Sequence, residues 1–453
     1  MFAEQSTLFV SVLKWSVLAS ITGLIVGAAT SLFLTLLGVF TRLGHRFPAG
    51  PAFLLLPIVL PVVVFIIRKL APTAEGHGTE KVIEAVHTRD GATDIKVVPV
   101  KLFATLLTIG AGGSVGKEGP AAQIGAGLAY TFAKIIQLNR NDAKRLVICG
   151  ISAGFAAVFG TPISGALFGA EVLYLGSMRY DVMFPCLVAG VVAHTVCQAG
   201  HSVRVKIAIP DVITHSHVES VLIALGSGIF FGLVALLLIQ MLKLAEHLKD
   251  KTHLKAELNA VLGGVVLIGV FYVSPRSVGL GIPLLTNVFA GDQVPLFAAW
   301  WKIAATSITL GFGGSGGIVT PMFVIGATSG YALAHVFGGP TAMLGAFGMV
   351  ALVAAGAGTP IAASVMALEL FGPTIGTYAA IACCTAYIVV GHRSVYPSQL
   401  LGGAKSASID IAEPNARVDQ MPDLEIKARR HSVLSLLGKI GHIIRPHDPP
   451  DGK

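Results

Sequence analysis

Four long, charge-free apolar runs constrain this chain more than any other feature of its sequence. They cover residues 15–40, 48–67, 221–242 and 261–273. A helix needs roughly 20 apolar residues to cross a bilayer core, so three runs are long enough and the fourth is re-entrant, tilted or longer than the run itself. Only 12% of the residues are charged, whereas ordinary soluble domains carry roughly a quarter. The sequence therefore predicts an all-α membrane protein that spans the bilayer repeatedly.

Glycine and proline interrupt this apolar sequence. The chain has 53 glycines, and prolines stand in or beside the apolar segments at positions 99, 120, 162, 283, 321 and 360. Within a bilayer, irregular backbone is tolerated only where its polar groups are buried in protein or line a cavity. We therefore expect broken helices around an internal site.

The chain also resembles itself. Three pairs of segments match in the same order, at offsets of 198 to 203 residues: 76–80 loosely with 279–283, 112–126 with 313–327, and 160–171 with 358–369. The pattern predicts two repeated halves, about 15–205 and 215–402, whose interface near mid-membrane holds the site. An odd number of spans in each half would make the repeats inverted, and we favour that arrangement.

The ends of the chain differ from its middle. Residues 1–14 read as a short amphipathic segment, 15–402 as the membrane domain and 403–453 as a polar tail. The tail is too short for a pair of regulatory domains and is expected to be mobile or to lie on the membrane surface. The formal charge of +8 comes mostly from loops and tails, which a positive-inside bias explains without a nucleic-acid partner.

Two of the matching segments place glycines directly before helix-compatible runs, at 120–133 and 321–336. Glycine lets the backbone approach a ligand, and proline in the first turn favours a helix start. Unpaired N–H groups and the positive dipole ends of such helices bind anions without a basic side chain in the membrane. The sequence thus predicts an anion site in which several helix starts meet.

Glu118 is the most informative single residue, because it lies in one of these helix-start loops within an apolar region. Charges at that depth are costly and usually functional. One interpretation is a gate, in which the carboxylate competes with the anion for the same amides and is released by protonation or displacement. The plainer alternative is that Glu118 caps its own helix and pairs with Lys117.

Four further polar residues have competing interpretations. Glu171 and Glu369 occupy equivalent repeat positions, and we expect them to bind polar backbone at helix ends. Tyr396 offers a hydroxyl to an anion or serves as an interfacial aromatic residue. His77, between two glycines, is an anion donor or an ordinary loop histidine.

The segment Gly116-Lys-Glu-Gly-Pro120 resembles the G[KR]EGP motif of the CLC chloride channel and transporter family, and the resemblance covers about residues 15–402. It implies that Glu118 is the gating glutamate. Gly317-Ile-Val-Thr-Pro321 resembles the GxFxP motif, whose backbone amides would bind the anion, and Tyr396 matches the tyrosine that coordinates it. Beside the gate Glu118, the candidate anion site consists of Gly76, His77, Gly78, Gly116, Lys117, Gly119, Gly317, Ile318, Val319 and Tyr396.

Three departures from the family pattern bear on mechanism. His77 stands where a serine hydroxyl usually contacts the anion, which leaves the preferred anion open. Val319 replaces a common phenylalanine at a contact made through backbone. Val172 stands where proton-coupled exchangers commonly carry an internal proton-relay glutamate. This valine resembles the channel branch and slightly favours a channel, although some exchangers also lack the acid.

The resemblance implies a multi-pass protein of the bacterial inner membrane that moves chloride or a similar small anion through a homodimer with one pore in each subunit. A bound chloride ion is expected, but no other cofactor and no metal. An ion-coupled transporter of a small organic solute is the alternative, because it also uses repeats and broken helices. A membrane-embedded enzyme ranks last, since the sequence shows no catalytic constellation of the kind such an enzyme needs.

Overall fold

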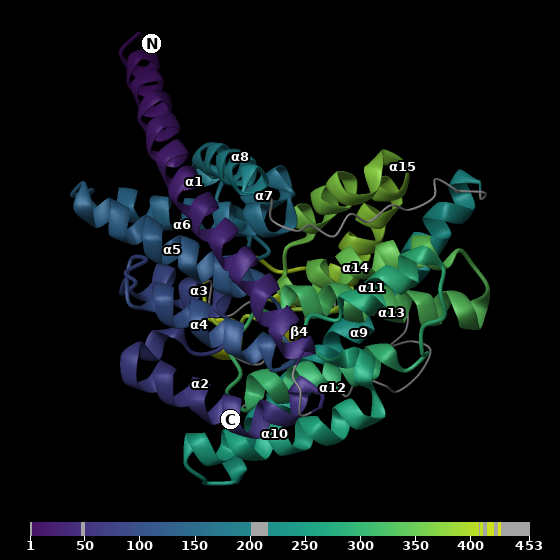
Figure 1. The fold of residues 1–453 in the computed structure, drawn as a ribbon. Helices are drawn as coiled ribbons and strands as arrows, with labels where there is room; N and C mark the ends of the chain where they lie inside the picture. Colours follow the sequence, from purple (N-terminus) through teal and green to yellow (C-terminus); the bar gives the residue numbers. More distant parts are fainter. Residues whose placement is uncertain are drawn as a thin grey trace, which may run out of the picture.

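The computed structural model describes residues 2–46, 50–200, 216–406, 408–410, 415–420 and 425–426. The helices before the gap at 201–215 are α1 (Phe2–His45), α2 (Leu56–Leu70), α3 (Thr79–Thr88), α4 (Val97–Gly110), α5 (Glu118–Ile135), α6 (Arg140–Phe159), α7 (Pro162–Glu171) and α8 (Met183–Ala199). Those after it are α9 (His217–Lys251), α10 (Ala256–Val273), α11 (Ile282–Ala290), α12 (Ala298–Gly311), α13 (Val319–Phe337), α14 (Thr341–Ala357) and α15 (Pro360–Val389). The chain folds as the predicted helical membrane protein (Figure 1).

Short elements connect these helices. The 3-10 helices are η1 (Ala52–Leu55), η2 (Pro72–Ala74), η3 (Tyr180–Val182), η4 (Pro275–Ser277) and η5 (Val418–Gln420). Strand β1 (Tyr174–Leu175) pairs in parallel with β2 (Leu400–Leu401), and β3 (Ile409–Asp410) pairs in antiparallel fashion with β4 (Glu425–Ile426). The β1–β2 pair connects the segment that follows α15 to the segment directly after α7. Most of the predicted tail, including 427–453, lies outside the described residues.

The helices of the two halves correspond one to one. Helices α4 and α12 are offset by 201 residues, and so are the starts of α5 and α13. Within α15, Gly372 takes a non-helical conformation (φ 78°, ψ 174°) before Pro373. This break divides α15 into 360–371 and 373–389, the counterparts of α7 and α8. The correspondence between the halves therefore continues from α4 and α12 to the two parts of α15.

Reciprocal hydrogen bonds relate the halves by a local two-fold axis. The Ser114 N–H donates to the Thr309 hydroxyl at 3.2 Å. The Ser315 N–H donates to the Thr108 hydroxyl at the same distance. Since each pair is the repeat image of the other, the contact is made by the same surface on both sides. This symmetry agrees with the predicted pair of inverted repeats.

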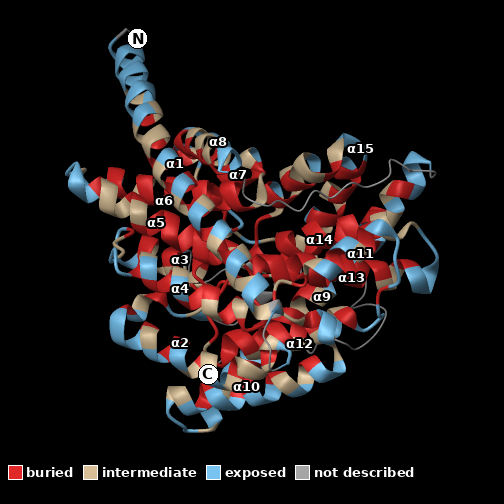
Figure 2. Ribbon diagram, in the orientation of Figure 1, coloured by how far each residue is buried: buried red, intermediate tan, exposed pale blue. Residues whose placement is uncertain are grey.

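Seven of the described helices are long and apolar enough to cross a membrane. The short run at 261–273 belongs to α10, which begins five residues earlier at Ala256 and reaches 18 residues. The N-terminal segment 2–14 continues into the first span without a break, as one helix that extends beyond the rest of the molecule (Figure 1). Buried residues concentrate around α6, α13 and α14, while the rim helices expose apolar side chains (Figure 2). This distribution suits a protein whose outer surface meets lipid.

Candidate anion site

The loops before α5 and α13 cross inside the protein. Gly116 and Gly317 form an antiparallel bridge, in which each N–H donates to the other carbonyl at 2.6 and 2.7 Å. These residues are repeat equivalents, so the bridge lies on the local two-fold axis. The helices that start directly after them, at Glu118 and Val319, point their N-terminal ends at one place. The positive ends of two helix dipoles therefore meet in the interior of the protein.

A third helix start joins this crossing. Gly78, with φ of +77°, precedes α3, and a Cβ there would lie 2.5 Å from the Gly119 carbonyl oxygen. A Cβ on Gly119 would collide with the His77 carbonyl oxygen, and one on Gly317 would lie 2.6 Å from the Gly119 nitrogen. Only glycine permits this backbone approach. The starts of α3, α5 and α13, predicted from separate motifs, are thus packed together.

A buried lysine fixes the loop that leads into α3. The Lys101 ammonium on α4 donates to the Ala74 carbonyl at 3.0 Å and to the Gly76 carbonyl at 2.6 Å. Its repeat counterpart Lys302 makes the equivalent bonds in the second half, to Ser277 and Gly279. Lys101 thereby holds the turn that carries His77.

Glu118 lies at the crossing and is fully buried. Its carboxylate accepts a hydrogen bond from the Thr320 N–H at 3.1 Å and another from the Thr320 hydroxyl. Both donors belong to the first turn of α13, in the other half of the chain. The carboxylate therefore occupies one of the helix starts that the sequence assigns to an anion. Lys117 immediately precedes α5, and the described structure records no hydrogen bond between its side chain and Glu118.

Two buried polar side-chain atoms near the crossing make no hydrogen bond of normal geometry with the described residues. Tyr396 is 0% exposed, and its hydroxyl makes no hydrogen bond of normal geometry, although the Thr79 side chain lies beside it. The His77 Nδ1 atom is buried and also makes no hydrogen bond of normal geometry with the described residues, although the Val395 backbone lies beside the ring. Because a buried donor is costly to leave unpaired, these atoms point to a ligand or water between them and the helix starts.

The remaining predicted residues lie in the same loops. Gly76, with φ of +74°, precedes His77, while Ile318 and Val319 form the cap and first residue of α13. The structure thus brings all ten predicted anion-site residues to three helix starts and one extended segment. Ion binding and gating at these residues stay predictions.

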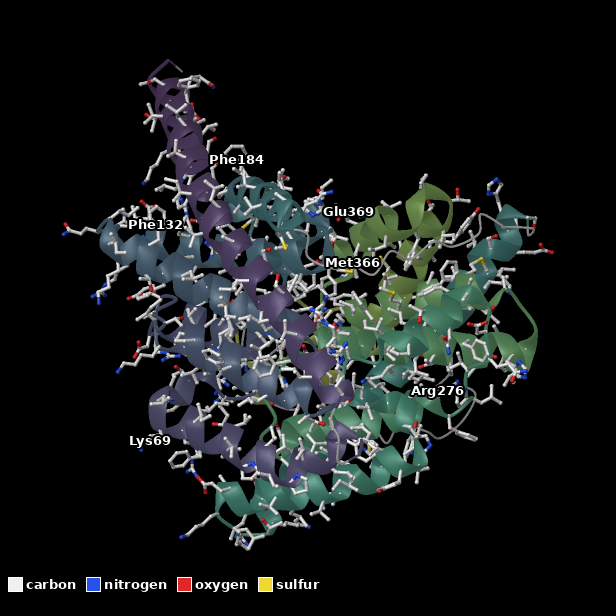
Figure 3. All side chains as sticks on the ribbon, in the orientation of Figure 1. Lys69, Phe132, Phe184, Arg276, Met366 and Glu369 are labelled. Carbon is white, nitrogen blue, oxygen red and sulfur yellow. The ribbon has the colours of Figure 1, made fainter. Side chains whose placement is uncertain are left out.

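The predicted role of Glu171 and Glu369 in binding helix ends is confirmed. The Glu171 carboxylate accepts from the N–H groups of Ile361 and Ala362 at 3.0 and 2.8 Å. Glu369, on the side of α15 toward α7, does the same with Ile163 and Ser164 at 3.0 and 2.8 Å (Figure 3). Each glutamate therefore caps the equivalent helix of the other half.

Thr320 and Glu80 were missed in the sequence analysis. Thr320 is the repeat counterpart of Gly119. The feature that could have indicated its role is therefore a hydroxyl at a helix start where the other half has a glycine. Glu80 stands in the first turn of α3, and its Oε1 accepts from the Ser398 N–H at 2.9 Å and from the Ser398 hydroxyl. An acid at the start of a helix in so apolar a chain was the signal for Glu80.

Two hollows lead toward the site. A cavity of about 720 Å³ is lined by Gly76, His77 and Glu80 and reaches exposed residues such as Lys255. A smaller one of about 210 Å³ touches His77, Val395 and Pro397. His77 borders both hollows, so it stands between the surface and the crossing loops.

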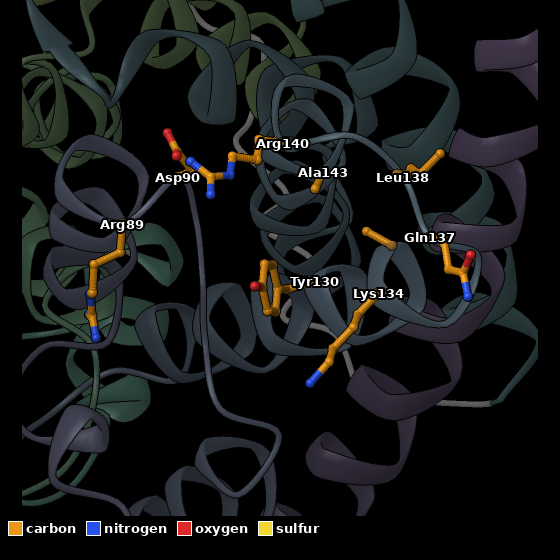
Figure 4. A pocket seen from close by; sticks show the side chains of 9 residues that line it. Arg89, Asp90, Tyr130, Lys134, Gln137, Leu138, Arg140 and Ala143 are labelled. Carbon is orange, nitrogen blue, oxygen red and sulfur yellow. The ribbon is translucent and has the colours of Figure 1, made fainter.

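Another hollow lies near the C-terminal ends of α3 and α5, away from the anion site. It measures about 470 Å³ and is lined by Arg89, Asp90, Tyr130, Ala133, Lys134, Gln137, Leu138, Arg140 and Ala143 (Figure 4). Lys134 lies about 24 Å along α5 from Glu118, at 1.5 Å per residue. Its basic side chains therefore belong to the surface and take no direct part in the anion site.

In this helical membrane domain, three helix starts converge on a buried carboxylate, and buried polar atoms that make no hydrogen bond of normal geometry with the described residues lie nearby. This arrangement is typical of proteins that move anions across membranes. A sequence model of the family described as voltage-gated chloride channels matches residues 59–391. A chloride/fluoride channel protein of Pseudomonas syringae pv. tomato is 38% identical over 413 residues, which are 89% of this chain and 90% of that protein. The chain belongs to this family, the CLC family.

Two further comparisons support the same fold and class. The H(+)/Cl(-) exchange transporter ClcA of Vibrio vulnificus is 27% identical over 392 residues, which are 80% of this chain and 81% of that protein. The crystal structure of a CLC-type fluoride/proton antiporter matches with a TM-score of 0.80 at 26% identity, over 85% of this chain and 98% of that one. These relatives are channels and transporters rather than enzymes.

Family membership decides between the predictions made from the sequence. The chain transports chloride or a similar small anion, as a channel or an exchanger, and the comparisons favour this function over transport of an organic solute. It is a multi-pass integral membrane protein, and its bacterial relatives place it in the inner membrane.

Proposed function

We propose that this chain exchanges a small anion, fluoride in preference to chloride, for protons, with Glu118 as the gate. The observation that carries the proposal is the position of the Glu118 carboxylate, which Thr320 holds across the repeat interface. The Tyr396 hydroxyl and the His77 Nδ1 atom are buried without hydrogen bonds of normal geometry to the described residues. A negatively charged side chain already occupies one anion position. A permeant anion fits between the other donors.

The chemistry of the donors supports a small, strongly hydrogen-bonding anion. His77 replaces the hydroxyl that family members commonly offer, so a buried imidazole nitrogen, which donates in one of its two tautomers, takes the place of that hydroxyl. Fluoride is the strongest hydrogen-bond acceptor among the halides, so strong donors in a site shielded from water are what it needs to offset its large cost of dehydration. Two similar proteins named above are described as a chloride/fluoride channel protein and a fluoride/proton antiporter.

Proton coupling follows from the competition at the helix starts. Ionised Glu118 accepts the hydrogen bonds of Thr320 and excludes an anion by charge repulsion. Protonation removes that charge, weakens the charge-assisted hydrogen bonds and frees the helix start for the anion. When the anion leaves, the carboxylate loses its proton and returns. Anion and proton then occupy the site alternately and move in opposite directions.

The functional unit we propose is a homodimer with one pore in each subunit, as the family resemblance implies. Apolar residues on α7, α8 and α15 are between 42% and 47% exposed in the single chain: Ile163, Phe184, Ile361 and Leu368. Light scattering of purified protein in detergent, corrected for the detergent mass, tests this assembly. A mass of one subunit would contradict it.

Reconstituted vesicles test the proposed exchange. Vesicles loaded with fluoride at neutral pH are diluted into fluoride-free buffer, while a fluoride electrode and a pH dye record anion efflux and proton uptake. We expect protons to move inward against an opposing proton gradient, driven by the fluoride gradient, and chloride to drive them less effectively. Fluoride efflux without proton uptake would instead define a channel. Equal rates for chloride would overturn the proposed preference.

A further inference from the structure

We propose that Glu80 is the internal carboxylate that passes protons between the wide cavity and the anion site, in place of the acid that is absent at Val172. The proposal rests on the proton-coupled exchange proposed above. Glu80 lines the same cavity of about 720 Å³ as His77. A proton acceptor at this position is in contact with solvent on one side and with the interior on the other.

The two carboxylate oxygens of Glu80 have different surroundings. Oε1 accepts the N–H of Ser398 at 2.9 Å together with the Ser398 hydroxyl. Oε2 is buried and has no hydrogen-bond partner among the described residues. A buried oxygen that nothing satisfies suits an acid that carries a proton part of the time or that binds a transient water.

Glu80 and Glu118 both lie near Tyr396. Tyr396 lies two residues before Ser398, which binds Glu80, and its hydroxyl feels the charge of both Glu118 and Glu80. The tyrosine is therefore near two carboxylates, of which Glu118 is at the gate and Glu80 lines the cavity. His77 precedes Glu80 by three residues, and its backbone carbonyl packs closely against Gly119 beside the gate.

The charged groups around Glu80 leave it without a salt bridge. Lys81, next to it on α3, pairs with Glu84 at 3.0 Å. Arg417, which donates to the Ser398 hydroxyl at 3.2 Å, pairs with Asp419 at 2.8 Å. The cavity also contains these more distant ionisable groups: Arg68, Glu75, His77, Glu246, Lys249, Asp250, Lys255 and Glu257. No described cation neutralises Glu80 directly, so its charge is free to change during transport.

The proton step conserves charge and atoms. Glu80 takes a proton from hydronium or a buffer acid in the cavity and becomes neutral. It then gives this proton, through the His77 imidazole or a water beside Tyr396, to the Glu118 carboxylate when the anion site is empty. Glu80 returns to its ionised form and the anion moves the other way. No redox partner or covalent intermediate is required.

A purely structural role would explain the same contact, because Glu80 also anchors the segment that carries Tyr396. Glu80→Gln separates the two roles: its amide oxygen still accepts from Ser398, but the side chain cannot hold a transferable acidic proton. We expect proton uptake per anion to fall at least about tenfold, while anion efflux persists. An unchanged proton-to-anion ratio in this variant would overturn the proposal.

Two further variants keep the test decisive. Glu84 lies one turn further along α3, pairs with Lys81 and does not line the cavity. We expect the proton-to-anion ratio of Glu84→Gln to match the parent protein; a loss as large as in Glu80→Gln would overturn the assignment. Ser398→Ala retains the carboxylate but removes one donor to its ionised form. We expect proton flux to reach half its maximum at a higher pH, and an unshifted profile would count against Glu80.

The failure of this proposal differs from failure of the proposed exchange. If the parent protein itself moves anions without protons, the exchange is wrong and Glu80 has no proton to pass. If the parent protein exchanges normally and Glu80→Gln does so too, only the assignment of Glu80 is wrong.

Discussion

The Glu118 carboxylate on α5 is bound by the backbone and the hydroxyl of Thr320 on α13, the counterpart of α5 in the other half of the chain. This contact joins the two repeats at the point where their helix starts cross. It also means that the release of the gate depends on a residue 202 positions away in the sequence.

Removing the hydroxyl in Thr320→Val should loosen the gate. A hydrogen bond to a charged group contributes about 1.5–3 kcal/mol, so the carboxylate should leave its position roughly 10 to 100 times more readily. We expect anion efflux from vesicles at neutral pH to rise. Thr328→Val is the control, because among the described residues that hydroxyl bonds only within α13, to Val324 and Ile325. An increase of the same size in both variants would argue against a specific contact with the gate.

Neutralising the gate in Glu118→Gln or Glu118→Ala should abolish the pH dependence of anion flux while the flux itself continues. The reason is that neither side chain can carry the negative charge that competes with the anion for the helix starts. Fluoride efflux measured over a range of pH gives the result directly. If neither variant moves anions at any pH although both fold, Glu118 is a structural cap, the alternative that the sequence left open.

Variants of the two equivalent buried lysines, Lys101 and Lys302, distinguish an effect on the anion site from an effect on folding. Lys101→Met leaves the Ala74 and Gly76 carbonyls without their donor, and each unsatisfied group costs about 1–3 kcal/mol. Lys302→Met does the same to Ser277 and Gly279. We expect similar losses of thermal stability in both variants, but a marked loss of anion flux only for Lys101→Met, whose loop carries His77. Equal effects on flux would show that the lysines act only on folding.

Gly119 is required at the crossing because the backbones of two helix starts approach too closely for a side chain, and not because the chain must be flexible there. In Gly119→Ala the added methyl group would meet the His77 carbonyl, so the starts of α3 and α5 would have to separate. We expect a loss of stability of about 1–3 kcal/mol or more and little remaining flux. Gly269→Ala on α10 is the control, because its Cβ would meet nothing within 4 Å. Melting curves and efflux rates are the measurements, and normal behaviour of Gly119→Ala would contradict the close approach.

Much of this architecture could be predicted because it depends on local sequence patterns. The charge-free runs marked the first span and α9, and the matching Gly-rich segments marked the starts of α5 and α13 to within two residues. The repeat offset also predicted that Glu171 and Glu369 play equivalent roles, since the same local sequence folds into the same element twice.

The contacts between the halves could not be predicted in the same way. Glu80 and Ser398 are 318 positions apart, and nothing in either local sequence specifies the other. Thr320 likewise replaces a glycine in the repeat alignment, and its local sequence does not indicate which carboxylate its hydroxyl binds. Such partners are set by the packing of whole helices, so they emerge only when the repeats are assembled in three dimensions.

Restoring the missing acid in Val172→Glu should not increase proton coupling. Val172 is fully buried at the end of α7, and its carbonyl accepts from the Gln399 amide at 2.7 Å. A carboxylate in this apolar cluster would lack a partner, and the larger side chain would also crowd the core at a cost of about 1–3 kcal/mol. We expect an unchanged proton-to-anion ratio and a lower melting temperature. Val172→Gln has nearly the same size without the charge and shows how much of the loss comes from crowding. More protons per anion in Val172→Glu than in either Val172→Gln or the parent protein would mean that position 172 still lies on the proton route, and that Glu80 does not replace it.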